Sequence, residues 1–283
     1  MGRIIALTAL AMIAFAANSV LARLALVGSV ADPLAYTGIR LASGALALAV
    51  LLGLFNHGSR FKIAGSWAGA AALFGYALAF SVAYILLGAG TGALILFASV
   101  QIGVIGWAIV KGDRPRALEW VGLAVAFAGL AYLVSPGLVA PRPLGALLML
   151  GAGLCWAAYT LIGRGSQSPL ADTTGNFIRC LPVALPLILA GALWRSLDAT
   201  SAAFAVASGV VASGMGYAIW YTVLPALSRT RAAIVQLTVP AIAAAGGVIF
   251  IAEPLSPRLL IASAAILGGV AFALATAERR RSA

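Results

Sequence analysis

A few polar side chains interrupt long apolar stretches of this sequence, and their chemistry could recognise a small molecule. Uncompensated hydrogen-bonding groups are costly in hydrocarbon, so polar side chains at membrane depth face either protein or a cavity. The polar residues nearest the middle of their stretches are Asn18, Ser99, Gln101, Gln236 and Thr238. We predict that they line a binding cavity. The alternative is that they join helices through hydrogen bonds, which contribute about 0.6 kcal/mol each on average.

A second set of residues is aromatic and recurs at helical spacing. Tyr76 and Phe80 are four residues apart, and Phe97 is four residues before Gln101, so each pair shares one helix face. Rings that stack on an aromatic or cationic substrate contribute roughly 0.5–1.5 kcal/mol per pair. The predicted aromatic lining, for which core packing is the alternative, consists of Tyr76, Phe80, Phe97, Trp156, Tyr159 and Tyr217. Tyr84, near the end of its stretch, is predicted to lie in the interfacial belt instead.

Other reactive groups are scarce. No Asp or Glu lies deep in an apolar stretch, and the one histidine, His57, lies in a polar loop. Cys155 and Cys180 lack metal-ligand spacing, and no Walker motif is present. We therefore predict no catalytic residue, no metal site and no cofactor, and facilitated movement of a substrate rather than proton antiport through a buried carboxylate.

The elements that must position these residues are membrane-spanning helices. The chain is 63% hydrophobic and 9% charged, whereas a soluble domain carries roughly 25% charged residues. The lipid bilayer is thus a predicted partner. Nucleic acid is not, because the basic residues lie in short loops and form no basic face. Runs of about 20 apolar residues predict ten spans, at 4–27, 34–55, 66–87, 91–110, 117–134, 144–163, 173–194, 201–224, 232–251 and 258–277.

The loops between the spans differ in positive charge, which sets orientation in the membrane. The side shared by both termini carries twelve basic residues: Arg3, Arg60, Lys62, Lys111, Arg114, Arg116, Arg164, Arg229, Arg231, Arg279, Arg280 and Arg281. The other side carries four: Arg23, Arg142, Arg195 and Arg258. We predict that both termini are cytoplasmic.

The two halves of the chain resemble each other at an offset of 139 residues. Thr91 falls on Thr230, and Arg40 falls on Arg179. Five spans per half is an odd number, so residues 1–137 and 138–283 are predicted to form two inverted five-helix repeats. Such repeats rock about a site near the bilayer midplane and give alternating access. Gene duplication without transport is the alternative.

Five residues within the spans are candidates for a hinge or gate. Arg40 and Arg179 lie about two turns inside their helices and are predicted to extend towards the interface and pair with a nearby loop acid or carbonyl, with a gate or an attraction for a substrate carboxylate as the alternative. Pro182 and Pro186 interrupt the seventh span, and Pro240 interrupts the ninth. Pro182 and Pro186 each remove a backbone hydrogen bond, so we expect a kink in the seventh span, and a static kink is the alternative to a hinge.

The segment 227–232, followed by Pro240, Glu253 and a span with paired glycines at 268–269, resembles the EamA-type branch of the drug/metabolite transporter superfamily. The first half departs from the pattern, with Gln101 in place of the proline and no counterpart of Glu253. Overall, the chain is most similar to bacterial aromatic amino-acid exporters of the YddG type. The resemblance implies a multi-pass inner-membrane exporter of amino acids or similar small metabolites.

Three other functions stay open at this point. A carrier of phosphorylated metabolites or nucleotide sugars shares the architecture but needs cationic side chains in its cavity, and the chain has no lysine at depth. An intramembrane enzyme needs a catalytic constellation that we do not find. A non-transporting membrane partner protein has no need of an inverted repeat with polar residues at mid-span. The sequence leaves the oligomeric state open, and a monomer is compatible with it.

Overall fold

The computed structural model describes residues 2–27, 31–55, 64–112, 117–135, 140–164, 166–194, 198–227, 232 and 235–282. His57 and the cations of 56–63, 113–116, 195–197 and 228–231 lie outside them. The described elements are all helical: α1 (Gly2–Leu26), α2 (Pro33–Phe55), α3 (Trp67–Leu86), α4 (Ala89–Val110), α5 (Ala117–Val134), α6 (Pro143–Ile162), α7 (Pro169–Trp194), α8 (Ala199–Ala207), η1 (Ser208–Met215), α9 (Gly216–Val223), η2 (Leu224–Ala226), α11 (Val239–Ile251) and α12 (Pro257–Ser282).

Nine spans in the described part of the chain are long and apolar enough to cross a membrane. One of them joins α8, the π-helix η1, α9 and the 3₁₀ turn η2 into a single run, Ala199–Ala226. This confirms the prediction of an all-α membrane protein. The boundaries agree with the predicted spans except at the ninth.

The span predicted at 232–251 is not one continuous helix. Residues 237 and 238 form a turn, and α11 begins at Val239 with Pro240 in its first turn. A proline in a helix interior would clash with the carbonyl four residues earlier, whereas the first turn tolerates it. Pro240 therefore starts a helix instead of kinking one. Gln236 and Pro240 do not share a face of one continuous helix, and residues 233–234 lie outside the described part.

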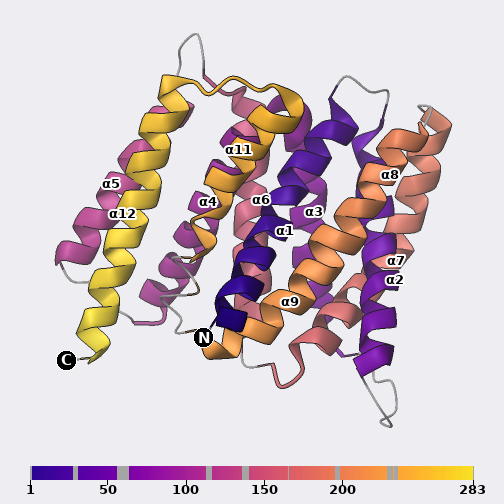
Figure 1. Ribbon diagram of the computed structural model, residues 1–283, viewed down its shortest axis with the longest axis horizontal. Coiled ribbons are helices and arrows are strands. Elements are labelled where there is room, and N and C mark those ends of the chain that lie inside the picture. The colour runs from indigo at the N-terminus through magenta and orange to yellow at the C-terminus, as the bar shows by residue number, and fades with distance from the viewer. Residues whose placement is uncertain are drawn as a thin grey trace.

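The helices form an antiparallel bundle in which α5 and α12 pair at one side and α2, α7 and α8 group at the other (Figure 1). Helices α1, α3, α4 and α6 lie between these groups (Figure 1). α1 begins and α12 ends at the same end of the bundle. This arrangement places the mid-bundle positions of α1, α3, α4, α6 and α9 around the centre.

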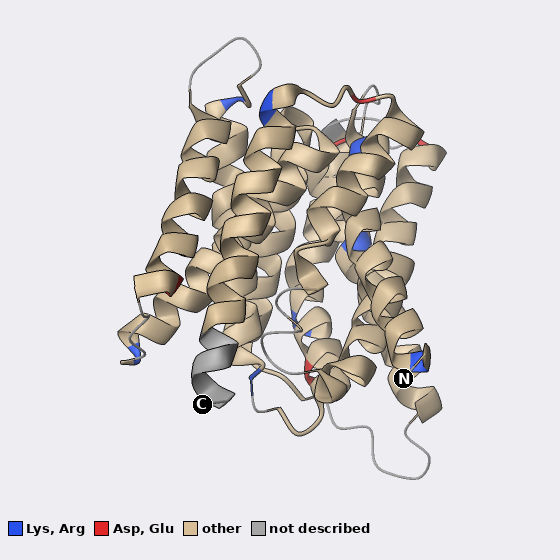
Figure 2. Cartoon of the chain, turned by 60° about the vertical axis from the view of Figure 1, so that its left-hand side comes forward, with Lys and Arg blue, Asp and Glu red and all other residues tan. Residues whose placement is uncertain are grey.

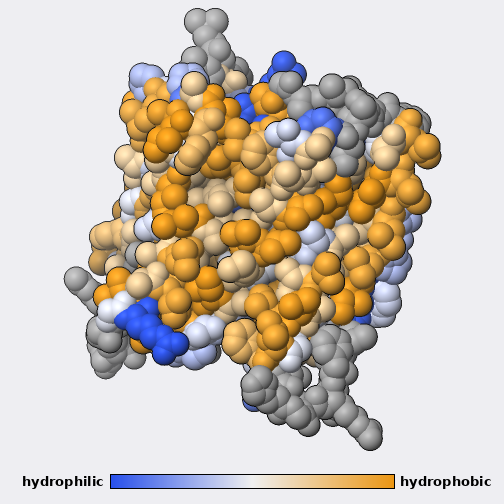
Figure 3. Space-filling model, turned by 45° about the vertical axis from the view of Figure 1, so that its right-hand side comes forward, coloured by the Kyte–Doolittle hydropathy of each residue, from blue (hydrophilic) through white to orange (hydrophobic). Residues whose placement is uncertain are grey.

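Charge and hydropathy divide the surface as a bilayer requires. Lysine, arginine, aspartate and glutamate gather towards the two ends of the bundle, with few between them (Figure 2). Apolar side chains cover most of the face in Figure 3. Large exposed hydrophobic side chains such as Leu46, Leu147, Leu189 and Ile249 are suited to contact with lipid.

Candidate functional site

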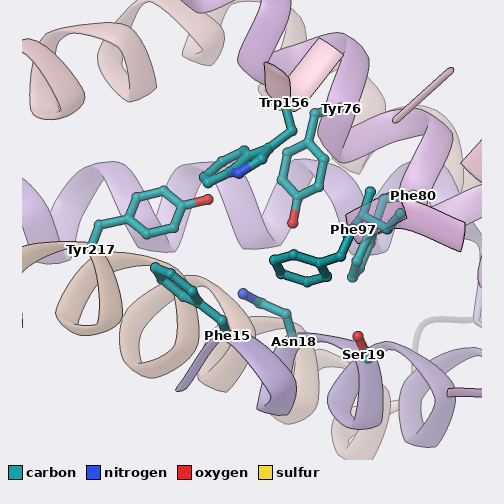
Figure 4. Close-up of a pocket in the computed structure, with 9 residues that line it drawn as sticks. Phe15, Asn18, Ser19, Tyr76, Phe80, Phe97, Trp156 and Tyr217 are labelled. Carbon is teal, nitrogen blue, oxygen red and sulfur yellow. The ribbon is translucent and has the colours of Figure 1, made fainter. Parts of the chain in front are cut away.

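A small cavity lies at the centre of the bundle (Figure 4). Its volume of about 20 Å³ has room for about one water molecule, so an amino acid enters only if the lining side chains move apart. Five helices contribute to it: α1, α3, α4, α6 and α9. The lining residues are Phe15, Asn18, Ser19, Tyr76, Phe80, Leu96, Phe97, Trp156 and Tyr217.

Aromatic rings make up most of the wall. The ring of Trp156 on α6 lies 4.8 Å from Tyr76 on α3 and 5.2 Å from Tyr217 on α9, measured between centroids. Phe15 meets the ring of Tyr217 edge-on at 5.7 Å, and Tyr76 lies 5.4 Å from Phe80. These separations fall in the favourable range for ring pairs, so the rings contact one another and must move apart before a further planar ring can stack between them.

The polar edge of the cavity depends on the π-helix. Ser208 donates a hydrogen bond to Oδ1 of Asn18 at 2.7 Å, and Ser213 donates to the same oxygen at 3.4 Å. Residues five apart point about 140° away from each other on an α-helix. The wider winding of η1, whose hydrogen bonds join residues five apart, brings both serines to one side. The two bonds hold the amide of Asn18 with its oxygen turned towards η1.

Arg40 lies behind this wall and is 2% exposed. Its Nη2 donates to the hydroxyl of Tyr76 at 3.0 Å, and its Nε donates to Ser213 at 3.3 Å. The guanidinium carbon lies 5.2 Å from the ring centre of Tyr76 and 4.8 Å from that of Phe80. The prediction that Arg40 extends towards the interface is wrong, because α2 packs against α3, α7 and η1 and the side chain turns into the bundle instead.

A chain of polar contacts leads from the cavity to one end of the bundle. The hydroxyl of Tyr84 donates to the cavity residue Ser19 at 2.7 Å, and Arg23 donates to the Tyr84 carbonyl at 3.0 Å. Arg23 also pairs with Glu253 at 2.6 Å, and Glu253 accepts from the backbone N–H of Ala89 at 2.7 Å. The prediction that Tyr84 lies in the interfacial belt is wrong, because this residue is fully buried.

Six of the predicted lining residues therefore meet around one cavity: Asn18, Tyr76, Phe80, Phe97, Trp156 and Tyr217. Tyr159 lies just behind them, with its ring 5.4 Å from Trp156 and its hydroxyl bonded to Thr173. Gln101 lines a second small cavity, between α4, α5 and α12. The hydroxyl of Ser99 donates to the Ile95 carbonyl.

The last two predicted lining residues lie in the broken ninth span. Gln236 is half-buried, and its side-chain amide donates to the carbonyl of Ala232 at 3.3 Å. Thr238 is exposed and donates to the carbonyl of Val235. The structure therefore does not bring these two residues to the central cavity.

The hinge and gate candidates lie on three helices: Arg40 on α2, Pro240 on α11, and Arg179, Pro182 and Pro186 on α7. Arg179 is at the opposite end of the bundle from Glu253, where it donates to the carbonyls of Ala64 and Gly175. Pro182 and Pro186 are interior residues of the single helix α7. Pro240 begins α11.

Sequence reasoning did not select Phe15, Ser19 or Leu96, or the serines of η1, as site residues. Phe15 lies three residues before Asn18 and would have followed from extending the face of Asn18 by one turn, and Ser19 lies four residues after Phe15 on the same side of α1. No sequence signal indicated the π-helix that aligns Ser208 and Ser213. Within the described residues, no group of three or more His, Cys, Asp or Glu side chains is placed to hold a metal ion.

Comparison with known proteins agrees with this architecture. Residues 143–275 match the EamA-like transporter family. An uncharacterised protein of Pseudomonas aeruginosa is 49% identical over 96% of this chain and 95% of its own length. The threonine/homoserine exporter RhtA of Escherichia coli is 32% identical over 58% of this chain and 57% of its own length. A crystal structure superposes with a TM-score of 0.65 at 22% identity, covering 96% of this chain and 99% of that one, which supports the fold alone.

Proposed function

Because the chain belongs to the EamA-like transporter family, we propose that it exports amino acids, with aromatic amino acids favoured, across a bacterial inner membrane. It is a multi-pass membrane transporter and not an enzyme. The observation that carries the aromatic preference is the central cavity, whose wall is built from Phe15, Tyr76, Trp156, Tyr217 and neighbouring rings. A substrate ring that enters between them gains stacking contacts of roughly 0.5–1.5 kcal/mol per pair.

Amino acids are favoured as the substrate class for two reasons. The relative RhtA is named as an exporter of threonine and homoserine. The cavity also combines rings with a few hydrogen-bonding groups, which is the usual composition of a small-molecule site. The polar groups are those of Asn18, Ser19, Tyr76 and Tyr217.

We propose alternating access as the mechanism, with residues 1–137 and 138–283 as inverted repeats. The packing supports this division, because α2 packs on α7, α4 on α11 and α5 on α12. Each pair joins a helix to its counterpart 139 residues later, which is the arrangement expected around a pseudo-two-fold axis. The cavity receives side chains from both halves, so rocking of one half against the other would open it.

The movement is proposed to be facilitated by the substrate gradient. Of the carboxylates whose side chains the structure describes, none lines the cavity. Proton-driven carriers place a titratable group of this kind on the substrate path. Glu253 lies at a bundle end and is paired with Arg23.

The test is uptake of radiolabelled tryptophan, phenylalanine and threonine into proteoliposomes that contain the purified full-length protein, with and without a pH gradient. We expect saturable uptake of the two aromatic amino acids above that of protein-free liposomes, unchanged by the gradient. Uptake of threonine alone would overturn the aromatic preference. Uptake that requires the gradient would overturn the facilitated mechanism, and no uptake of any amino acid would overturn the proposed function.

A further inference from the structure

We propose that the central cavity recognises the carboxylate of its substrate and does not require the ammonium group. Aromatic carboxylates without an amino group are then accepted at least as well as the corresponding amino acids, and aromatic amines are rejected. The inference rests on the proposed function only in placing the substrate in this cavity. Three observations carry it: a buried arginine without an acidic partner, the direction of the hydrogen bonds around the cavity, and the positions of the acids.

The buried arginine supplies a positive charge beside the cavity. Arginine stays protonated in proteins, and burying a charge without a counter-ion is costly. Among the described residues, Arg40 has hydroxyl partners but no carboxylate partner, and its Nη1 has no hydrogen-bond partner. Tyr76 and Phe80, which its guanidinium contacts, both line the cavity. An anion in the cavity would therefore compensate this charge.

The hydrogen bonds around the cavity turn donors inward. The hydroxyl of Tyr76 accepts from Arg40, so its own proton is available elsewhere, and Figure 4 shows this hydroxyl directed into the cavity. Oδ1 of Asn18 accepts from both serines of η1. The amide nitrogen of Asn18, which can only donate, therefore points towards the cavity, as Figure 4 shows. Two donors with a cation behind them suit the oxygens of a carboxylate.

Acidic groups that would match an ammonium are engaged elsewhere. Glu253 binds Arg23 and the Ala89 N–H, and Asp172 accepts from the Gly65 N–H. Asp32 and Asp198 accept from backbone N–H groups at the starts of α2 and α8. Glu119 lies on α5, which does not contribute to this cavity. Among the described residues, a substrate ammonium would meet ring faces and hydroxyl oxygens here but no carboxylate.

Arg40 is a positioning residue in this scheme. It reaches the substrate through Tyr76 and, by way of Ser213, through Asn18. It orients both donors and sets the sign of the potential in the cavity. Its replacement should change which charge the cavity prefers, and not merely how stable the bundle is.

The experiment measures binding by calorimetry on the full-length protein in detergent, with tryptophan, indole-3-propionate and tryptamine as probes. Indole-3-propionate lacks the ammonium group, and tryptamine lacks the carboxylate. We expect the dissociation constant of indole-3-propionate to be no more than threefold above that of tryptophan. The dissociation constant of tryptamine should be at least tenfold above that of tryptophan. Binding of tryptamine as tight as that of tryptophan would overturn the proposal, and so would a tenfold loss of affinity for indole-3-propionate.

Variants then assign the preference to the residues. Arg40→Gln should reduce the preference for indole-3-propionate over tryptamine about tenfold, a change of about 1.4 kcal/mol, and Arg40→Lys should retain most of it. Tyr76→Phe, which removes one donor, should weaken the binding of indole-3-propionate and leave the binding of tryptamine unchanged. This variant also tests the assignment if Arg40→Gln does not fold. The control is Arg258→Gln, which removes another buried arginine. Arg258 lies on α12, which does not line this cavity, and it donates to the Tyr132 carbonyl.

The control should keep the full preference for indole-3-propionate over tryptamine. An unchanged preference in Arg40→Gln or Tyr76→Phe would contradict the assignment.

Failure of this inference is distinguishable from failure of the proposed function. If proteoliposomes transport no amino acid but the carboxylate preference holds in binding, only the proposed function fails. If tryptophan is transported but tryptamine binds equally well, only the carboxylate inference fails.

Discussion

Trp156 connects the two sides of the cavity at the scale of single residues. Its ring contacts Tyr76 of the first half and Tyr217 of the second, at 4.8 and 5.2 Å. In Trp156→Ala both contacts are lost, together with the surface on which a substrate ring would stack. We expect the KM for tryptophan uptake to rise about tenfold in proteoliposomes, and Trp156→Phe to show a smaller rise.

The matched control for this prediction is Trp120→Ala. Trp120 lies on α5, is 50% exposed and does not line the cavity. Its replacement should leave the KM within twofold of the unaltered protein. An equal rise in the KM of both alanine variants would mean that general loss of packing, and not ring stacking in the cavity, determines the effect.

Residue type and depth within the apolar runs predicted much of the cavity lining. The other lining residues depend on which helices pack against each face, which the sequence does not show. Phe97 and Gln101 are four residues apart on α4, yet Phe97 lines the central cavity and Gln101 lines the space beside α5 and α12. One helix face meets different neighbours along its length, and sequence spacing does not show where they change. Arg40 was likewise placed at the right depth, but its direction depends on three neighbouring elements.

The π-helix η1 is the element on which the polar edge of the cavity depends. A side chain added at Gly209 of η1 would overlap the hydroxyl of Ser43 and the carbonyl of Arg40. The close approach holds η1 against α2 and so keeps Ser213 within reach of Arg40. No periodicity in the sequence distinguished this segment from the α-helix on either side of it.

Gly209→Ala should therefore destabilise the protein, because overpacking between rigid backbones costs about 1–3 kcal/mol. We expect the melting temperature in detergent to fall by several degrees. Gly151→Ala on α6 is the control, since a Cβ there meets nothing within 4 Å and alanine favours a helix over glycine. A melting temperature for Gly209→Ala equal to that of the control would show that η1 can move away from α2 without loss.

The ninth predicted span shows where prediction of elements from apolar runs fails. The run at 232–251 is long enough for one helix, and apart from Pro240 its apolar composition gives no reason to divide it. The division comes from Pro240, whose ring cannot follow a helical turn, and from the local bond between Thr238 and the Val235 carbonyl. The remaining spans are continuous over the apolar runs that predicted them. This includes α7, which contains Pro182 and Pro186 within one helix.

At the scale of the whole molecule, different polar contacts close the two ends of the bundle. Arg23 and Glu253 join α1 to the segment after α11 at one end. At the other end, the carboxylate of Asp172 on α7 accepts from the Gly65 N–H at 2.8 Å, next to the start of α3. The proposed alternating access would require these two closures to open in turn. The positive-inside count predicts that the Arg23 end lies outside the cytoplasm.

These two closures predict opposite effects of two substitutions that each remove one charge. Glu253→Gln weakens the pair with Arg23 and should increase the population open to the outside. Asp172→Asn weakens the closure at the cytoplasmic end and should decrease that population. The measurement is labelling by a membrane-impermeant thiol reagent, applied outside cells, of a cysteine introduced by Leu96→Cys in the cavity wall, with Cys155 and Cys180 replaced by alanine.

We expect Glu253→Gln to label at least threefold faster than the parent protein and Asp172→Asn to label more slowly. Asp198→Asn, at the start of α8, is the control because its carboxylate caps its own helix through Ser201 and joins neither closure. If Glu253→Gln slowed labelling and Asp172→Asn accelerated it, the orientation with both termini in the cytoplasm would be reversed. If both substitutions changed labelling in the same direction, the two ends would not open in turn, and a rocking motion of the two halves would be the wrong description of this bundle.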